Sequence, residues 1–196
     1  MNVEHITIKA LLTLPNMLTC FRFVAAPPLL WFAWQGYGNA FLCLLAFTFL
    51  TDILDGFAAR LLHQESELGA LLDSSGDLVI YTIMAISIWW LWPEIVQREK
   101  TVIILAIISF AAPVLVGLIK FHAFTRYHTW LVKVAVVTIG LAFFILFIFD
   151  IAWPFQCATI ICLLAATEEI AITCYLSEMR SNVPSLWHLI QQRNNA

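Results

Sequence analysis

Charged residues are scarce in this sequence of 196 residues. Only 12% of them are Asp, Glu, Lys or Arg, whereas a soluble domain typically has about 25%. This deficit excludes an ordinary soluble domain. Cationic residues are also too few to form a basic face for nucleic acid, because ten Lys and Arg stand against thirteen Asp and Glu.

The sequence also lacks paired cysteines. It has five cysteines, an odd number, and all lie in apolar stretches: Cys20, Cys43, Cys157, Cys162 and Cys174. No C-x-x-C pair occurs, so neither a disulfide framework nor a zinc site is indicated. We expect buried, unpaired thiols. The sequence shows neither an internal repeat nor a low-complexity segment.

Apolar residues are abundant instead. They make up 62% of the chain, and the mean hydropathy is +0.88. A membrane-spanning helix needs roughly 20 apolar residues, and six stretches approach or exceed that length: 18–34, 40–61, 68–92, 102–119, 130–149 and 151–176. The pattern predicts an all-α polytopic membrane protein with six transmembrane helices, in which residues 1–196 form a single membrane domain.

The ends and loops of the chain predict its orientation. Residues 1–15 mix charged and apolar side chains, as in an interfacial amphipathic helix, and do not resemble a cleaved signal peptide. Residues 177–196 are polar and are expected to form a cytoplasmic tail. Six spans place eight Lys and Arg on one side and only Arg98 and Lys100 on the other. Since cytoplasmic loops are enriched in such residues, both termini should be cytoplasmic.

Four aspartates lie at the ends of two predicted spans. Asp52 and Asp55 are near the end of the second span, and Asp73 and Asp77 are near the start of the third. Ionisable residues at membrane depth are costly and commonly mark a functional site. We therefore interpret residues 51–77 as the functional region of the chain.

Helical geometry predicts that these four carboxylates meet. At 100° per residue, Asp52 and Asp55 share one face of a helix, together with Gly56 and Ala59. Asp73 and Asp77 lie one turn apart, on a face with Gly69. An antiparallel hairpin folded about residues 63–67 would oppose Asp52 to Asp77 and Asp55 to Asp73.

Such a cluster requires cations. Desolvation costs several kcal/mol per buried ion before mutual repulsion is added, and in this region the sequence offers Arg60 as the nearby cation. Carboxylate oxygens without His or Cys favour hard divalent ions such as Mg²⁺, Mn²⁺ or Ca²⁺. Two ions would balance four charges, and two-metal sites commonly assist phosphoryl displacement.

At this point the sequence resembles a known family. Residues 52–77 match every fixed position of D-x-x-D-G-x-x-A-R-x8-G-x-x-x-D-x-x-x-D, the signature of the CDP-alcohol phosphatidyltransferases. Residues 15–22 resemble the P-N-x-L-T-x-x-R entry segment of bacterial members, among them the phosphatidylglycerophosphate synthases. The six predicted spans agree with the family's architecture.

The resemblance implies an enzyme of phospholipid biosynthesis. Such an enzyme transfers a substituted phosphate, usually the phosphatidyl group of CDP-diacylglycerol, to a hydroxyl acceptor and releases CMP. Asp52, Asp55, Asp73 and Asp77 would bind two divalent cations, Mg²⁺ or Mn²⁺, with Ca²⁺ as a non-productive occupant. Asp77 would also serve as the general base. The cytidine diphosphate site would be lined by Gly56, Ala59, Arg60 and Gly69.

The resemblance further implies a homodimer in the bacterial inner membrane, with the active site facing the cytoplasm.

A cationic cluster that could bind an acceptor phosphate is formed by Lys120, Arg126 and Lys133. Positive-inside topology explains the same residues equally well. The cluster favours glycerol 3-phosphate as acceptor, with inositol phosphate, serine or another polar alcohol as alternatives. We hypothesise that Glu168 or Glu169, inside the sixth span, pairs with Lys133 or Arg126; a purely structural ion pair is the alternative.

Two other classes of function are open to a chain with this pattern. Acidic residues in membrane helices also mark cation transporters, but transporters usually place them in both halves of a repeat, and here they belong to one hairpin. The other class is an inactive scaffold of the same fold. The presence of every signature acid favours the enzyme over both.

Overall fold

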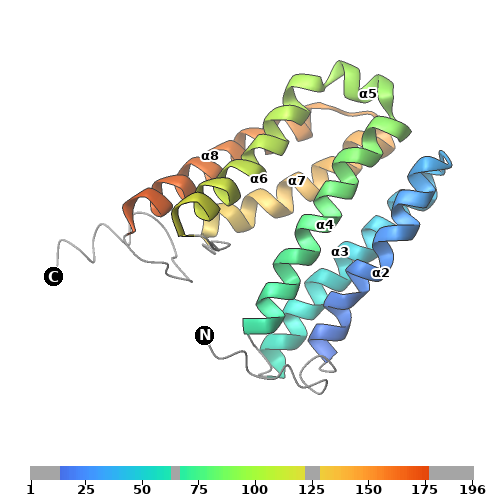
Figure 1. The fold of residues 1–196 in the computed structure, drawn as a ribbon. Helices are drawn as coiled ribbons and strands as arrows, with labels where there is room; N and C mark the ends of the chain where they lie inside the picture. Colours follow the sequence, from blue (N-terminus) through green and yellow to red (C-terminus); the bar gives the residue numbers. More distant parts are fainter. Residues whose placement is uncertain (1–13, 63–66, 122–128, 177–196) are drawn as a thin grey trace. The chain divides into compact units, whose positions relative to one another are not determined.

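A computed structural model describes residues 14–62, 67–121 and 129–176 (Figure 1). The described residues are helical apart from short turns, and no strand occurs among them. The helices are α2 (Leu14–Trp34), α3 (Gly38–Leu61), α4 (Glu67–Leu91), α5 (Pro93–Arg98), α6 (Lys100–Phe121), α7 (Trp130–Phe149) and α8 (Trp153–Tyr175).

The prediction of six membrane-spanning helices is confirmed. All the helices except α5 are long and apolar enough to cross a membrane. The predicted interfacial segment at residues 1–15 and the polar tail at 177–196 lie almost wholly outside the described residues. The chain divides into two compact units, Met1–Pro93 and Glu94–Ala196, which we describe separately. The expected single membrane domain stays a prediction.

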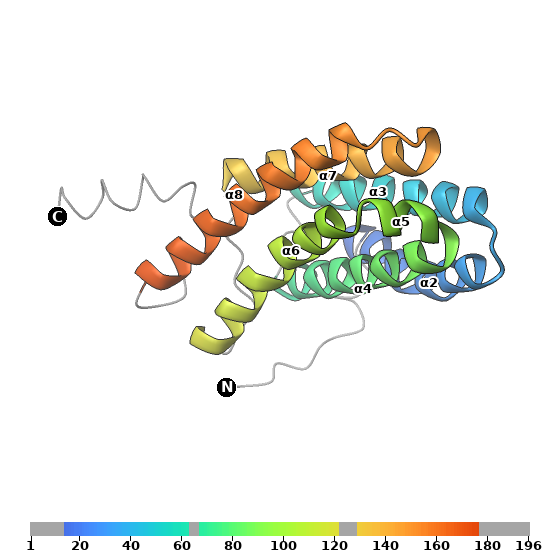
Figure 2. The same ribbon diagram turned by 90° about the horizontal axis from the view of Figure 1, so that it is seen from above.

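The first unit is organised around α2. This helix packs closely against both α3 and α4, whereas α3 and α4 make little direct contact with each other in the part of the chain described here (Figure 2). Buried residues recur on α2 at the helical period: Arg22, Ala25, Leu29 and Ala33. Pro27 and Pro28 lie within α2, as membrane helices tolerate when neighbouring groups satisfy the backbone.

A tight turn joins α2 to α3. Gly36 adopts a left-handed backbone with φ of +78°, which costs glycine little because it has no Cβ. The backbone N–H of Gly38 donates to the carbonyl of Gly36, and a Cβ at Gly38 would lie 3.1 Å from the Trp92 ring. The first residue of α3 therefore lies close to Trp92, which directly follows α4.

The second unit is organised around α8, which packs against both α6 and α7. Small residues line this contact, and the buried cluster contains Ala135, Cys162 and Ala165, with Phe110 and Ile139 packed against it. Close approach through small side chains is the usual way in which membrane helices associate.

The segment 93–100 lies between two of the predicted spans. Residues Pro93–Arg98 of this segment form the short helix α5. Pro93 suits a first helical position, Glu94 and Arg98 have the signs that a helix dipole favours at its two ends, and Val96 is fully buried. Glu99 follows α5; it is buried and accepts a hydrogen bond of 3.0 Å from Gln156 Nε2.

Asp150 forms a tight turn at the end of α7. Asp150 has φ of +58° and ends α7, with its N–H donating to the carbonyl of Leu146. Aspartate is one of the few residues that adopt this conformation readily. Its carboxylate pairs with the Arg98 guanidinium, so the turn is bound to the end of α5.

The expectation for the cysteines is only partly correct. All five are unpaired, but only Cys162 is buried, and Cys43, Cys157 and Cys174 are exposed. In a membrane protein an apolar stretch faces lipid on one side and protein on the other. An apolar neighbourhood in the sequence therefore does not imply burial inside the protein.

We predict that Asp150→Asn slightly lowers the melting temperature of the detergent-purified protein at neutral pH. Asparagine retains the left-handed turn but loses the ion pair. The hydrogen bond from Arg98 holds the pKa of the Asp150 carboxyl below its usual value. The pair therefore stabilises the fold above the usual carboxyl pKa, and its contribution is lost as the pH falls through the lowered value. The two melting temperatures should converge in acid; a gap that stays constant would assign no role to the ion pair.

Candidate functional site: an acidic cluster around Arg22

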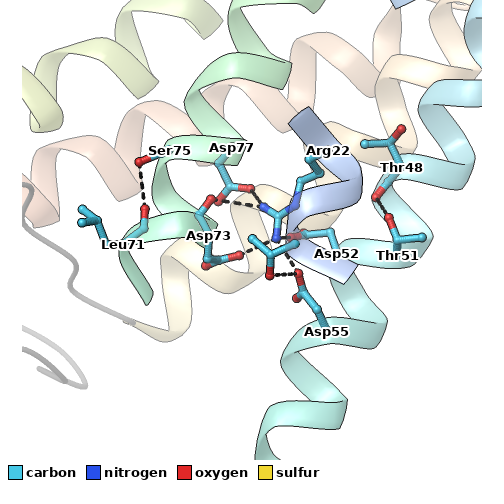
Figure 3. A network of polar contacts seen from close by, with 10 residues as sticks. Arg22, Thr48, Thr51, Asp52, Asp55, Leu71, Asp73, Ser75 and Asp77 are labelled. Carbon is cyan, nitrogen blue, oxygen red and sulfur yellow. Dashed lines mark hydrogen bonds and ion pairs between the residues drawn. The ribbon is translucent and has the colours of Figure 1, made fainter. Parts of the chain in front are cut away.

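Three helices of the first unit bring charged side chains together. Asp52 and Asp55 lie in the second half of α3, Asp73 and Asp77 lie in the first half of α4, and Arg22 lies in the first half of α2. Because successive spans run in opposite directions, these parts of the helices lie at the same end of the unit (Figure 1). Figure 3 shows the Arg22 side chain reaching from α2 among the four aspartates.

Arg22 contacts all four carboxylates. Its Nη2 atom lies 2.7 Å from Asp52 Oδ1, 2.6 Å from Asp55 Oδ2 and 2.6 Å from Asp73 Oδ1. Its Nη1 atom lies 2.5 Å from Asp77 Oδ1 and donates to the backbone carbonyl of Asp73 at 3.2 Å. The Arg22 side chain is only 2% exposed, so the guanidinium itself is shielded from water.

The four carboxylates differ in exposure. Asp55 is buried, and its Oδ2 also accepts a hydrogen bond of 2.7 Å from the Thr19 hydroxyl. Asp52, Asp73 and Asp77 each expose about a third of their side chain. Asp55 is therefore held by two residues of α2, whereas the other three remain accessible to a ligand.

The convergence of the four aspartates agrees with the sequence prediction, but its cause does not. The hairpin argument expected α3 and α4 to oppose their carboxylates directly, with Arg60 as the nearby cation. Instead α2 packs against both helices, and its Arg22 supplies the charge. Arg60 lies in α3, but its side chain is outside the described residues.

Sequence reasoning therefore missed Arg22 and Thr19 as members of the site. A usable signal was present, because an arginine inside an apolar span requires an anionic partner, and both residues belong to the P-N-x-L-T-x-x-R segment at 15–22. That segment and the aspartates are far apart in sequence, and only the packing of α2 joins them.

Three of the aspartates could hold a metal ion. Asp52, Asp55 and Asp73 each offer one oxygen, and these oxygens lie within 4.8 Å of one another. Purely oxygen ligands of this kind suit hard divalent cations such as Mg²⁺, Mn²⁺ or Ca²⁺. The donor set therefore fits the predicted metal, and Asp77, bound to the same guanidinium, lies beside it.

Two glycines shape the space around the cluster. Gly76 is buried, and a Cβ there would lie 3.4 Å from Arg22 Cδ, so a side chain larger than that of alanine would compete with Arg22 for space. A Cβ at Gly56 would meet nothing within 4 Å, so α3 has open space beside Asp55. Sequence reasoning included Gly56 but missed Gly76. The other expected nucleotide-site residues, Ala59 and Gly69, are half-buried.

The predicted acceptor residues lie in the second unit. Lys120 Nζ donates hydrogen bonds of 2.9 Å to the backbone carbonyls of Thr173 and Cys174 at the end of α8. Lys133 Nζ lies 5.0 Å from the centre of the Trp130 ring, in cation–π contact. Arg126 lies outside the described residues. Both lysines thus have structural partners, and their binding of an acceptor stays a prediction.

Glu168 and Glu169 lie in α8 and are half-buried. The hypothesis that one of them pairs with Lys133 or Arg126 is not tested by these positions.

The fold and the cluster together define a class: a multi-pass, all-helical membrane protein with an acidic, metal-compatible site formed by its first three spans. The family model of the CDP-alcohol phosphatidyltransferases matches residues 12–173. The chain belongs to this family.

The chain is similar to several proteins that carry the names of lipid-synthesising enzymes. It is 33% identical over 122 residues to the CMP-forming cardiolipin synthase of Streptomyces coelicolor, which covers 58% of this chain and 54% of that protein. It is 37% identical over 68 residues to the CDP-diacylglycerol–glycerol-3-phosphate 3-phosphatidyltransferase of Aquifex aeolicus, covering 35% and 38%. A CMP-forming cardiolipin synthase of Rattus norvegicus is 40% identical over 77 residues, covering 39% and 26%.

The chain spans about half the length, or less, of these curated relatives. No solved structure matches it.

We predict that Gly76→Leu lowers the free energy of unfolding by about 1–3 kcal/mol, because its branched side chain must occupy the volume of Arg22 and overpacks the site. Gly76→Ala should remain close to the wild type, since its Cβ makes ordinary contacts of 3.4 to 3.5 Å with Arg22. Thermal or denaturant unfolding in detergent measures both variants. Equal stability of the leucine variant would mean that Arg22 does not lie against Gly76.

Proposed function

We propose that this protein transfers the phosphatidyl group of CDP-diacylglycerol to a hydroxyl acceptor and releases CMP. The observation that carries this proposal is the convergence of all four signature aspartates on a single buried cation. In a membrane protein such a concentration of carboxylates is costly unless it serves a ligand.

We propose Asp52, Asp55, Asp73 and Asp77 as the residues that hold two divalent cations, Mg²⁺ or Mn²⁺. When bound, such ions neutralise diphosphate oxygens and stabilise the leaving phosphate. The chain itself positions the carboxylates. Thr19 and Arg22 orient Asp55, and α2 keeps α3 and α4 at the spacing that brings their aspartates together.

Asp77 is our candidate for the general base. It lies outside the group of three acids whose oxygens are within 4.8 Å of one another, and about a third of its side chain is exposed. An acceptor hydroxyl can therefore approach its carboxylate. In the proposed reaction Asp77 takes the hydroxyl proton, the acceptor oxygen bonds to the phosphorus of the phosphatidyl group, and the phosphorus–oxygen bond to CMP breaks.

The nucleotide is proposed to lie against Gly56, Ala59, Arg60 and Gly69. The open space beside Gly56 supports this placement, because the backbone of α3 is accessible there next to Asp55. Space for a Cβ at this position is consistent with room for a ligand beside α3.

Glycerol 3-phosphate is the acceptor that we favour, with Lys120, Arg126 and Lys133 as proposed contacts to its phosphate. Among the relatives, the Aquifex protein carries the name of a glycerol-3-phosphate phosphatidyltransferase. The cardiolipin synthase names of other relatives favour a second candidate, a lipid alcohol such as phosphatidylglycerol. Inositol phosphate and serine are further alternatives.

We further propose that the protein is a homodimer in the inner membrane, with both termini and the acidic cluster on the cytoplasmic side. The excess of Lys and Arg in the loops predicted to be cytoplasmic supports this orientation. The lipid substrate would then enter from the cytoplasmic leaflet.

The purified protein should release CMP from CDP-diacylglycerol when Mg²⁺ or Mn²⁺ and a suitable acceptor are present. A panel of glycerol 3-phosphate, phosphatidylglycerol, inositol phosphate and serine identifies the acceptor by chromatography of the lipid product. Failure to consume CDP-diacylglycerol with any acceptor and metal would refute the proposed reaction. Metal-dependent ion flux in proteoliposomes would instead support a transporter.

Asp77→Asn should reduce turnover by about 10²- to 10⁴-fold, the usual contribution of a general base, while nucleotide binding persists. The control is Asp150→Asn, the same substitution at an exposed aspartate of the second unit, which should retain activity. CMP release measures turnover, and equilibrium binding of a CDP analogue measures affinity. Substantial activity in the Asp77 variant would remove its assignment as the base.

Gly56→Ala should weaken CDP-diacylglycerol binding without destabilising the protein. The added methyl group meets no protein atom within 4 Å, and alanine improves helix propensity by about 1 kcal/mol, so any loss reports ligand space alone. Gly140→Ala in α7 is a matched control, because its Cβ also meets nothing within 4 Å. An unchanged KM for CDP-diacylglycerol in the Gly56 variant would place the nucleotide elsewhere.

A further inference from the structure

One nitrogen of Arg22 lies against the same acids that could coordinate a metal ion. Nη2 is within 2.7 Å of one oxygen each of Asp52, Asp55 and Asp73, and these three residues form the group with metal-compatible spacing. An arginine and a divalent ion would thus use the same carboxylates. The Nη2 group and a divalent ion cannot both lie at the centre of these three carboxylates.

The guanidinium satisfies this set of oxygens incompletely. An Arg amino nitrogen carries two protons, and Nη2 uses them in hydrogen bonds to Asp55 and Asp73. The contact with Asp52 is therefore an ion pair without a proton of its own. A planar donor with two protons serves two acceptors well, whereas three converging oxygens suit a spherical cation.

The charges that the described residues bring to the cluster are also unequal in number. One guanidinium faces four carboxylates, and its Nε atom is buried with no hydrogen-bond partner among the described residues. A divalent ion supplies twice the charge of Arg22 at the same carboxylates. The acids therefore favour replacement of the Nη2 contacts by a divalent cation once such an ion is available.

We propose that Arg22 is a built-in competitor for the metal site. Its guanidinium holds Asp52, Asp55 and Asp73 together, and a divalent cation binds by displacing Nη2 from these three carboxylates. The contacts of Nη1 with Asp77 and with the Asp73 carbonyl keep Arg22 beside α4 during this exchange. Arg22 is thus a positioning residue that preassembles the acids and lowers their affinity for metal. This inference rests on the proposal that these acids bind a divalent ion.

The test is Mn²⁺ binding to detergent-purified protein without nucleotide or lipid, followed by the electron paramagnetic resonance signal of unbound Mn²⁺. Arg22→Gln removes the charge and keeps an amide donor, so the dissociation constant for Mn²⁺ should fall by about 5- to 150-fold, the usual range of coupling between two ligands. Arg22→Lys keeps a competing cation and should remain near the wild type. Arg98→Gln, the same loss of charge in the second unit, is the control and should leave the constant unchanged.

A second measurement uses the wild-type protein, in case the Arg22→Gln variant does not fold. Mn²⁺ should accelerate modification of Arg22 by phenylglyoxal, read by peptide mass spectrometry, because displacement releases its amino groups. Modification of exposed Arg98 should not change with Mn²⁺.

The outcomes separate this inference from the proposed function. Mn²⁺ binding by the wild type, with equal or weaker binding by folded Arg22→Gln, would overturn the competitor role and leave the metal site intact. So would modification of Arg22 that Mn²⁺ leaves unchanged or slows. Absence of Mn²⁺ binding in the wild type and in Arg22→Gln would overturn both the inference and the metal site itself.

Discussion

The pairing of Arg22 with four aspartates is the constraint on which the first unit depends. Carboxylates on α3 and α4 would repel one another in a medium of low dielectric constant, and the desolvation of each charge costs several kcal/mol. A single guanidinium from α2 contacts all four. The position of α2 between its neighbours and the convergence of the acids are therefore consequences of the same interaction.

Apolar packing and small residues adapt the helices to this polar centre. The buried stripe of α2 continues from Arg22 through Ala25 and Leu29 to Ala33, so one helix face carries both the cation and the core. The Arg22 side chain lies against Gly76 of α4, and Thr19 adds a neutral hydrogen bond to the most buried aspartate. Among its described residues, the second unit has no comparable cluster of ion pairs with four carboxylates. Its core contains small side chains packed around Cys162.

Much of this organisation could be predicted from sequence, because the signals are local. Runs of apolar residues indicated six spans, and the spacing of Asp52, Asp55, Asp73 and Asp77 indicated that they meet. The role of Arg22 could not be derived from spacing, since it depends on which helix packs between which others. For the same reason, the exposure of Cys43 and the hydrogen bonds of Lys120 to α8 carbonyls were not apparent. The helix α5 was missed because its six residues are too few to show a helical pattern between two long apolar spans.

The order of synthesis gives the Arg22 contacts a consequence for assembly. A ribosome delivers α2 to the membrane before α3, and α3 before α4. The arginine therefore enters without its anions, and an isolated Arg side chain at membrane depth must reach toward the lipid headgroups to stay hydrated. Half of its partners arrive with the second span and the other half only with the third. The set of four contacts can therefore be completed only after α4 has been inserted, and a chain arrested before that point would offer Arg22 only the two carboxylates of α3.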